Sequence, residues 1–198
     1  MEISKQEKII FSVPNLIIVT GVPGSGKTVL SLGLYDCGIK KEKGVLDFLS
    51  AFYIGKDMIN DGFIKERSGE YYPIIRKGTY DAIDNIIGRN LELRNSVWVD
   101  ATYATEVKNR DWAYRYLLMV QRYNSKLKLI RCVGSEDSIT ERLTNRDYHR
   151  DRDKLANLKK FFEDEPIDLY VPYGGMVLDR SGDNLTENRK QVIEFLQK

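Results

Sequence analysis

The sequence predicts one α/β domain, built from a parallel sheet of about five strands with helices on both faces. The chain has 198 residues, of which 42% are hydrophobic, enough to fill a single core. Short apolar runs rich in β-branched residues alternate with longer segments of helical periodicity, a pattern typical of parallel sheets. No internal repeat, low-complexity tract or interdomain linker interrupts this alternation, so we expect residues 1–198 to form one domain.

Five short segments are expected to form the strands. They are residues 16–20, 51–54, 97–99, 127–133 and 176–178. Each is a compact apolar run of strand length, and the first is continuously apolar or β-branched. Ligands of parallel α/β sheets lie beyond the carboxyl ends of the strands. The residues that follow these runs are therefore the first candidates for a functional site.

Helices are expected between the strands. They are predicted to begin near Lys27 and at Asp57, and to cover residues 80–93, 105–123 and 137–147. A last helix follows Asn184 and Glu187, which form a capping pair. The segment 105–123 is expected to be one long helix, because its apolar residues recur at i, i+3, i+4 and i+7. Residues 67–79 are expected to form a loop or an insertion.

Composition and charge exclude several classes of protein. The net charge of +2 is far below that of proteins that coat duplex nucleic acid, although contact with a few phosphates stays open. No apolar run reaches the ~20 residues that span a bilayer, and the N-terminus lacks the pattern of a secretory signal. Cys37 and Cys132 are expected to be reduced thiols of a cytoplasmic protein. His149 is the only histidine, which argues against a multi-histidine metal site.

The segment after the first predicted strand carries the strongest motif in the chain. It matches G-x-x-x-x-G-K-[ST] in full, with Gly21, Val22, Pro23, Gly24, Ser25, Gly26, Lys27 and Thr28. The glycines let backbone N–H groups surround the β-phosphate, and the helix that follows adds its positive end. Lys27 should reach the β- and γ-phosphates, and Thr28 should ligate Mg²⁺. We therefore expect ATP or another nucleoside triphosphate to bind with Mg²⁺, on a P-loop NTPase three-layer sandwich.

Two aspartates stand where the second and third predicted strands end. Asp100 follows residues 97–99, and it could hold Mg²⁺ through water or orient the acceptor of a phosphate. Its alternative role is that of a turn or capping residue. Asp57 follows residues 51–54, and its carboxylate could accept the proton of an attacking hydroxyl. The alternative for Asp57 is an N-cap of the next helix.

A group of arginines and one of tyrosines complete the candidates. Arg142, Arg146 and Arg150 are spaced by four residues, so a helical lid over about 135–155 would present them on one side, toward the phosphates. The alternative is a solvated, salt-bridged face, because Glu141–Asp153 contains as many acidic residues as arginines. Arg110 could reach the acceptor, or be an ordinary exposed helix residue. Tyrosines that could stack on a base, or pack in the core instead, are Tyr71, Tyr72, Tyr80 and Tyr103.

Taken together, these segments resemble the phage-type polynucleotide 5′-hydroxyl kinases, with zeta-toxin-like and related small P-loop kinases as wider relatives. The resemblance rests on GVPGSGKT, YIGKD, VWVDATY and ERLTNRDYHR, which cover roughly residues 15–155 in order. It implies that Asp57 is the general base, that Arg142 and Arg146 are lid arginines, and that Asp100 is an acidic residue on the acceptor and metal side. It also implies a phage- or virus-encoded enzyme. The chain departs from the family at Asn60, where polynucleotide kinases usually have an arginine that holds the 3′-phosphate of the acceptor.

Three functions remain open from the sequence. The leading hypothesis is a kinase that transfers the γ-phosphate of ATP to a nucleic-acid hydroxyl, typically at a 5′-OH end, or on a modified base in DNA. The second is a kinase of a small molecule such as a nucleoside, sugar or antibiotic. The third is a non-catalytic NTP-binding regulator or toxin component. Asp57 and the lid arginines favour an enzyme, because binding alone requires neither. The sequence gives no oligomeric state.

Overall fold

The computed structural model describes residues 11–36, 51–63, 70–103, 106–146, 148–165, 167, 170–182 and 184–198. Cys37 and Thr105 lie outside these residues, as do residues 67–69 of the predicted loop. The part of the chain that is described contains the strands, the glycine-rich turn and most of the lid.

In the described part of the chain, five parallel strands form one sheet, as predicted. They are β1 (Asn15–Thr20), β2 (Ala51–Gly55), β3 (Ser96–Asp100), β4 (Lys126–Val133) and β5 (Met176–Asp179). Their order across the sheet is β2-β3-β1-β4-β5, and every neighbouring pair is parallel. β1 therefore lies at the centre, and its carboxyl end meets those of β3 and β4 at one edge.

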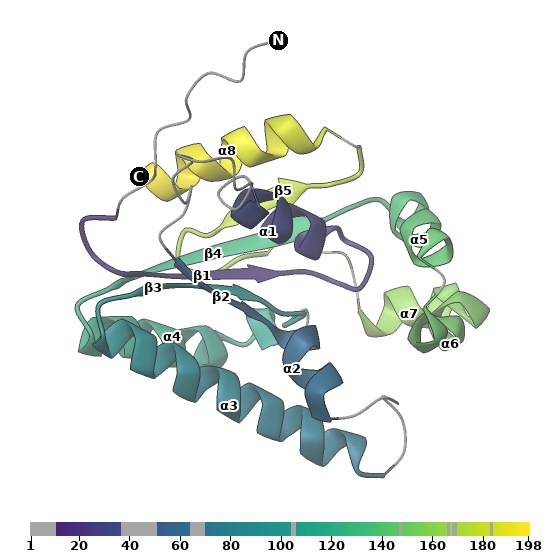
Figure 1. The fold of residues 1–198 in the computed structure, drawn as a ribbon. Coiled ribbons are helices and arrows are strands. Elements are labelled where there is room, and N and C mark those ends of the chain that lie inside the picture. Colours follow the sequence, from purple (N-terminus) through teal and green to yellow (C-terminus); the bar gives the residue numbers. More distant parts are fainter. Residues whose placement is uncertain are drawn as a thin grey trace.

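Helices cover both faces of this sheet (Figure 1). One face carries α1 (Lys27–Asp36) and α8 (Leu185–Gln197), and the other carries α3 (Tyr72–Glu92) and α4 (Arg110–Arg122). The short helix α2 (Lys56–Phe63) follows β2. The lid stands beside the sheet and contains α5 (Glu136–Asn145), the 3₁₀ turn η2 (His149–Asp151), α6 (Arg152–Ala156) and α7 (Leu158–Asp164). The fold is the predicted three-layer α/β sandwich.

The strands separate two hydrophobic cores because successive side chains point to opposite faces. In β1, Leu16 and Ile18 pack with α3 and α4, whereas Ile17 and Val19 pack with α1 and α8. All four are fully buried. A continuously apolar strand is therefore required at the centre, and this is the pattern that identified β1 in the sequence.

Helix α3 begins eight residues earlier than the sequence predicted, so the expectation of a loop over 67–79 is wrong from Tyr72 onward. The segment contains Pro73 and Gly78, two residue types that are frequent in loops. Pro73 lies in the first turn of the helix, where its missing N–H leaves no bond unmade. In these early turns the Thr79 hydroxyl oxygen lies 2.9 Å from the carbonyl oxygen of Ile75, one turn before it.

Two other predicted helices are interrupted in the structure. The helix expected over 105–123 begins at Arg110, after the 3₁₀ turn η1 (Glu106–Lys108). Asn109 between them has extended backbone angles, and its side chain accepts from the N–H of Asp111 as an N-cap. The helix expected over 137–147 ends at Asn145. Arg150 therefore does not continue the helical spacing of Arg142, and its side chain lies outside the described part.

The final helix agrees with its prediction. The Asn184 side chain accepts from the N–H of Glu187 at 3.1 Å, so it is the N-cap of α8. Within the described residues, the structure contains no helix with the length and apolar character that crossing a membrane requires.

Candidate active site

The glycine-rich turn between β1 and α1 has the backbone of a phosphate-binding loop. Gly21, Gly24 and Gly26 have φ angles of +150°, +83° and +82°, which residues with a side chain rarely adopt. The turn also leaves no room for a side chain at Gly21, because a Cβ there would clash with the carbonyl oxygen of Cys132. Because α1 begins at Lys27, its positive end faces this turn. We call residues 21–28 the cradle.

The other members of the cradle differ in exposure. Val22 and Ser25 are buried, Pro23 and Lys27 are half-buried, and Thr28 is exposed. The N–H of Ser25 donates to the carbonyl of Val22 at 3.1 Å and closes the turn. The lysine and the threonine thus lie at the accessible side of a turn whose remaining residues support it.

The entrance of the cradle is bound to the segment that follows β3. The carbonyl of Thr102 accepts from the N–H of Gly21 at 3.1 Å and also from the hydroxyl of Thr20. The next residue, Tyr103, has a positive φ of 35° and is buried. Its hydroxyl meets that of Tyr116 at 3.0 Å, and Tyr116 donates to Asp84 at 2.7 Å. This network fixes the carbonyl that holds Gly21.

Base stacking by Tyr80 and Tyr103 is contradicted by this packing. The two rings contact each other with centroids 4.8 Å apart, and Tyr103 also packs against Trp112 at 4.9 Å. Tyr103 has its hydroxyl inside the protein. Of the other two tyrosines considered, Tyr71 is exposed and Tyr72 is half-buried.

Asp100 lies at the carboxyl end of β3, opposite Val19 of β1, and is 5% exposed. Its carboxylate accepts from the Tyr53 hydroxyl at 3.3 Å and lies near the Thr28 side chain of the cradle. Burial raises the pKa of Asp100, and the Lys27 charge and the Thr28 hydroxyl offset only part of that effect. A buried carboxylate beside the cradle threonine is suited to accept a cation.

Asp57 lies near the same edge, in the first turn of α2. That helix begins at Lys56, so Asp57 does not precede it as an N-cap would. Its side chain is 47% exposed and lies 3.5 Å from the Lys56 ammonium, which is itself largely buried. The Asp57 charge contributes to the raised pKa of both Asp100 and Tyr53, so these groups share one region.

The two lid arginines have different environments. Arg142 donates through Nη2 to the carbonyl of Arg180, and its Nη1 lies 3.8 Å from where a Cβ of Gly26 would be. Arg146, at the C-cap of α5, donates through Nε to buried Asp151 at 2.6 Å. Arg142 therefore borders the cradle, whereas Arg146 is bound within the lid.

The carboxylate that holds Arg146 is itself unusual. Burial alone would raise the pKa of Asp151, but hydrogen bonds from Arg146 and Lys154 outweigh it and hold the pKa below its usual value. Asp151 is therefore ionised at neutral pH and joins α5 to α6. The alternative that the sequence left open for the arginine group was a solvated, salt-bridged face. The pair of Arg146 and Asp151 is a salt bridge, as that alternative requires, but its acid is buried rather than solvated.

Some residues of the region were missed by the sequence analysis. Arg180 follows β5 directly, and the rule that selected Asp100 could have selected it too. Glu165 ends the lid, and burial raises its pKa while the Lys27 charge lowers it. No sequence signal points to Glu165, because α7 was not predicted. Arg110, which was predicted, is exposed in the first turn of α4.

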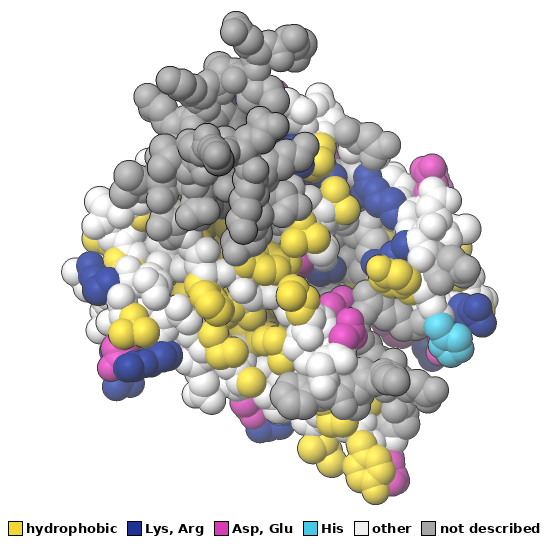
Figure 2. Space-filling model, in the orientation of Figure 1, with side chains coloured by type: hydrophobic (Ala, Val, Ile, Leu, Met, Phe, Trp, Pro, Cys, Tyr) yellow, Lys and Arg dark blue, Asp and Glu magenta, His cyan; other side chains and the backbone are white. Residues whose placement is uncertain are grey.

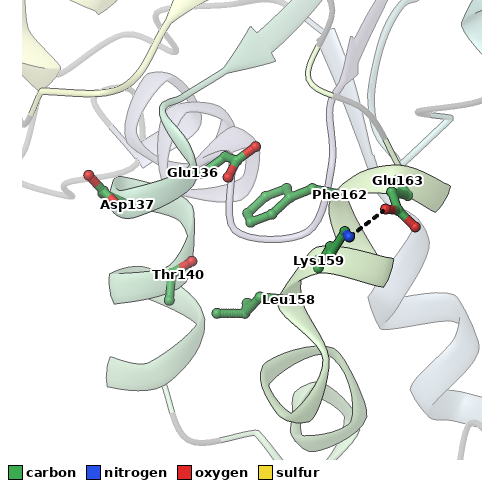
Figure 3. A pocket seen from close by; sticks show the side chains of 7 residues that line it. All are labelled: Glu136, Asp137, Thr140, Leu158, Lys159, Phe162 and Glu163. Atoms are coloured by element: carbon green, nitrogen blue, oxygen red, sulfur yellow. Dashed lines mark ion pairs between the residues drawn. The ribbon is translucent and has the colours of Figure 1, made fainter.

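A separate hollow lies between α5 and α7, with a volume of about 490 Å³ (Figure 3). Its lining comes from the two helices: Glu136, Asp137, Thr140, Leu158, Lys159, Phe162 and Glu163. Lys159 and Glu163 form an ion pair at 4.0 Å. Three carboxylates against one lysine do not suit a triphosphate, and no residue of the cradle lines this hollow.

In the space-filling view, both acidic and basic side chains are visible where the lid meets the body of the molecule (Figure 2).

Comparison with known proteins agrees with the fold. Residues 16–163 match the family described as an AAA domain. A protein from Chloroflexus aurantiacus assigned as a kinase is 22% identical, with a TM-score of 0.68 over 93% of this chain and 97% of that one. A sugar kinase from Janibacter sp. HTCC2649 gives 15% identity and a TM-score of 0.62, covering 93% and 95%. The Pnkp1/Rnl/Hen1 RNA repair complex gives 15% and 0.50, covering 83% of this chain and 50% of that one. At these identities the solved structures show the fold.

Proposed function

The chain belongs to this AAA-domain family of P-loop proteins, and from that premise we propose that it transfers the γ-phosphate of ATP to a hydroxyl group. One observation carries the proposal. The cradle, the buried carboxylate of Asp100 and the half-exposed carboxylate of Asp57 lie at the same edge of the sheet. A phosphoryl donor site thus adjoins a group that can accept a proton, which is what transfer to an alcohol requires.

The donor side is assigned to the cradle and the lid. Backbone N–H groups of the cradle and Lys27 bind the β- and γ-phosphates, and Arg142 faces them from α5. Thr28 and Asp100 offer oxygen atoms to Mg²⁺, which prefers such ligands and usually keeps several waters. The fit is supported by the proximity of these two side chains, since the Thr28 hydroxyl lowers the pKa of Asp100. Within the described residues no three His, Cys, Asp or Glu side chains cluster as a metal cage, so Mg²⁺ would bind together with the phosphates. When bound, it neutralises charge on the phosphates.

The acceptor side is assigned to Asp57. Its carboxylate is accessible to a substrate, and it adjoins Asp100 without being buried with it. In the proposed reaction Asp57 accepts the proton of the acceptor hydroxyl as that oxygen bonds to the γ-phosphorus. The bond from phosphorus to the β–γ bridging oxygen breaks, and ADP leaves.

The acceptor that these residues favour is a small hydroxylated molecule such as a nucleoside or sugar. Asn60 is fully buried, and its Oδ1 accepts from the Thr79 hydroxyl at 2.6 Å. It cannot replace the arginine that polynucleotide kinases use for the 3′-phosphate. The carboxylates of Asp57 and Asp100 accept hydrogen bonds from hydroxyls and repel phosphodiesters.

A nucleic-acid hydroxyl is the second candidate, at a 5′-OH end or on a modified base in DNA. Two observations favour it: the likeness to the RNA repair complex that contains Pnkp1, and the position of Asp57 directly after β2, where the resembling kinases have their base. A 5′-OH end without a 3′-phosphate needs no counterpart of the missing arginine.

The test is transfer of radiolabelled γ-phosphate from ATP to a panel of acceptors in the presence of Mg²⁺. The panel contains nucleosides, sugars, an aminoglycoside, and 5′-OH oligonucleotides of DNA and RNA with either a 3′-OH or a 3′-phosphate. Lys27→Ala is the control, with its melting temperature measured alongside. We expect labelling of a small acceptor by the wild type and none by a folded Lys27→Ala. Labelled oligonucleotides alone would favour the second candidate. ATP binding without transfer to any acceptor would instead indicate a regulator.

A further inference from the structure

A buried arginine lies against the last glycine of the cradle. Arg180 is 4% exposed, and its Nε and Nη2 lie 3.2 and 3.5 Å from where a Cβ of Gly26 would be. Gly26 therefore permits the turn through its positive φ and also admits the guanidinium. Arg180 stands directly after β5, and the cradle directly after β1, two strands apart in the sheet.

The position of Arg180 is fixed from three directions. Its backbone N–H donates to the carbonyl of Val133 at 2.7 Å, and its Nη1 donates to the Asn188 side chain at 2.5 Å. Asn188, in α8, returns a bond from Nδ2 to the carbonyl of Asp179 at 3.0 Å. The carbonyl of Arg180 in turn accepts from Nη2 of Arg142. One residue thus contacts the cradle with its side chain and the lid arginine with its backbone.

A guanidinium is an expensive group to bury, and an apolar side chain would stabilise this position at least as well. Its placement between the cradle and Arg142 therefore points to a role other than stability. We propose that Arg180 is a positioning residue that couples the cradle to Arg142, so that the lid arginine is aimed at the phosphates when they are bound. This inference rests on the proposed function, because it assumes a nucleoside triphosphate in the cradle.

A double-mutant cycle tests the coupling. The variants are Arg180→Met, Arg142→Met and both together, since methionine keeps part of the length of the side chain without its charge. We measure ATP affinity by calorimetry, kcat and KM for ATP in the transfer assay, and the melting temperature. Arg180→Met should lower kcat roughly 10- to 100-fold in the wild-type background, the range expected for residues in contact. In the Arg142→Met background the same change should lower kcat less than about twofold.

Two further variants keep the test decisive. Asn188→Leu removes the hydrogen bond that holds the Arg180 guanidinium but keeps the arginine. It should also lower kcat, and this effect should likewise disappear in the Arg142→Met background. If Arg180→Met does not fold, Asn188→Leu takes its place in the double-mutant cycle. Arg189→Met is the matched control, because Arg189 is the next residue of α8 and its guanidinium packs against Gly33 of α1, away from the cradle. Its kcat should stay within about twofold of wild type.

The outcomes separate this inference from the proposed function. If the wild type binds ATP and transfers phosphate but the effects of Arg180→Met and Arg142→Met multiply independently, Arg180 has only a structural role and the inference is overturned. A wild type that does not bind ATP would overturn both the proposed function and the coupling. A kcat effect that vanishes in the Arg142→Met background supports the coupling.

Discussion

Asp57→Asn separates chemistry from stability at the acceptor side of the site. The stability that the carboxylate contributes is small. Its ion pair with Lys56 spans 3.5 Å, and the Asp57 side chain is 47% exposed, so after solvent screening the pair contributes at most about 1 kcal/mol. A negative charge in the first turn of α2 adds a few tenths. A loss of about 1 kcal/mol lowers the melting temperature of a domain of this size by about 2–4 °C.

The expected loss of activity is far larger than the loss of stability. Asparagine keeps the size of the side chain but cannot accept the proton of the acceptor. General acid–base catalysis typically contributes 10²–10⁴-fold, so we expect turnover to fall at least ~100-fold. ATP affinity should stay near that of the wild type, because Asp57 is not part of the cradle. The assay is the initial rate of γ-phosphate transfer at saturating ATP and acceptor, with ATP binding measured by calorimetry.

The matched control is Asp81→Asn, which removes another exposed carboxylate paired with a lysine. Asp81 lies 2.8 Å from the Lys77 ammonium on α3, and its loss should leave transfer unchanged within about twofold. If Asp57→Asn retains a third or more of the wild-type rate, the assignment of the base is refuted. Asp100 would then be the next residue to test. A fall in ATP affinity that accounts for the lost rate would likewise contradict the role in proton acceptance.

Four other variants test the cradle, the buried carboxylate and the lid. Asp100→Asn should abolish most transfer and yet raise the melting temperature. Because burial raises the pKa of Asp100 in the folded state, its ionisation opposes folding. The gain should be absent below the usual pKa of about 4, grow as pH rises from there to the raised pKa, and stay constant above it. A melting curve in which the gain shrinks as pH rises would contradict this sign. Gly24→Ala, at φ +83° and with its Cβ 3.0 Å from Ile139, should cost about 1–2 kcal/mol and weaken ATP binding in calorimetry; unchanged affinity would show that the cradle tolerates the strain. Arg142→Ala should lower turnover roughly 10²–10³-fold, as for loss of a charge partner of the transition state. Arg146→Ala should instead lower the melting temperature with a smaller loss of turnover, because Arg146 pairs with buried Asp151; a loss of turnover as large as that of Arg142→Ala would show that Arg146 also reaches the phosphates.

The central part of the fold could be predicted from the sequence because burial on both faces leaves a local signature. β1 and β3 are completely buried, so their central residues, Leu16–Val19 and Val97–Val99, are apolar without interruption. The cradle is predictable for a similar reason, since the phosphate-binding turn requires glycines at fixed places. The carboxyl ends of β3 and β2 then point to Asp100 and Asp57 without knowledge of the loops.

The first residues of α3 and α4 could not be predicted, because the residue found at each boundary is compatible with more than one local structure. Pro73 usually indicates a loop, but it is equally suited to the first turn of a helix. Asn109 ends one turn and caps the next helix, although the apolar spacing runs on past it. Only tertiary contacts decide between these alternatives, and the sequence does not contain them.

The relation between the lid and the cradle was also out of reach of the sequence. Spacing by four residues placed Arg142 and Arg146 on one side of a helix, but it could not show that Arg146 binds Asp151 while Arg142 binds the backbone of Arg180. Helix α7 is seven residues long, and so short a helix leaves little periodicity to detect. Contacts between segments far apart in the chain depend on the packed structure.

The thiol beneath the cradle gives the protein a built-in reporter. Cys132 is 1% exposed, its carbonyl touches the turn at Gly21, and burial raises the pKa of its thiol to about 12. At neutral pH the thiolate, the form that reacts with alkylating agents, is therefore rare while the thiol stays buried. In a Cys37→Ser background, the labelling rate of Cys132 would therefore follow how often the centre of the sheet opens. A nucleotide that stabilises the cradle would therefore lower the rate at which Cys132 is alkylated.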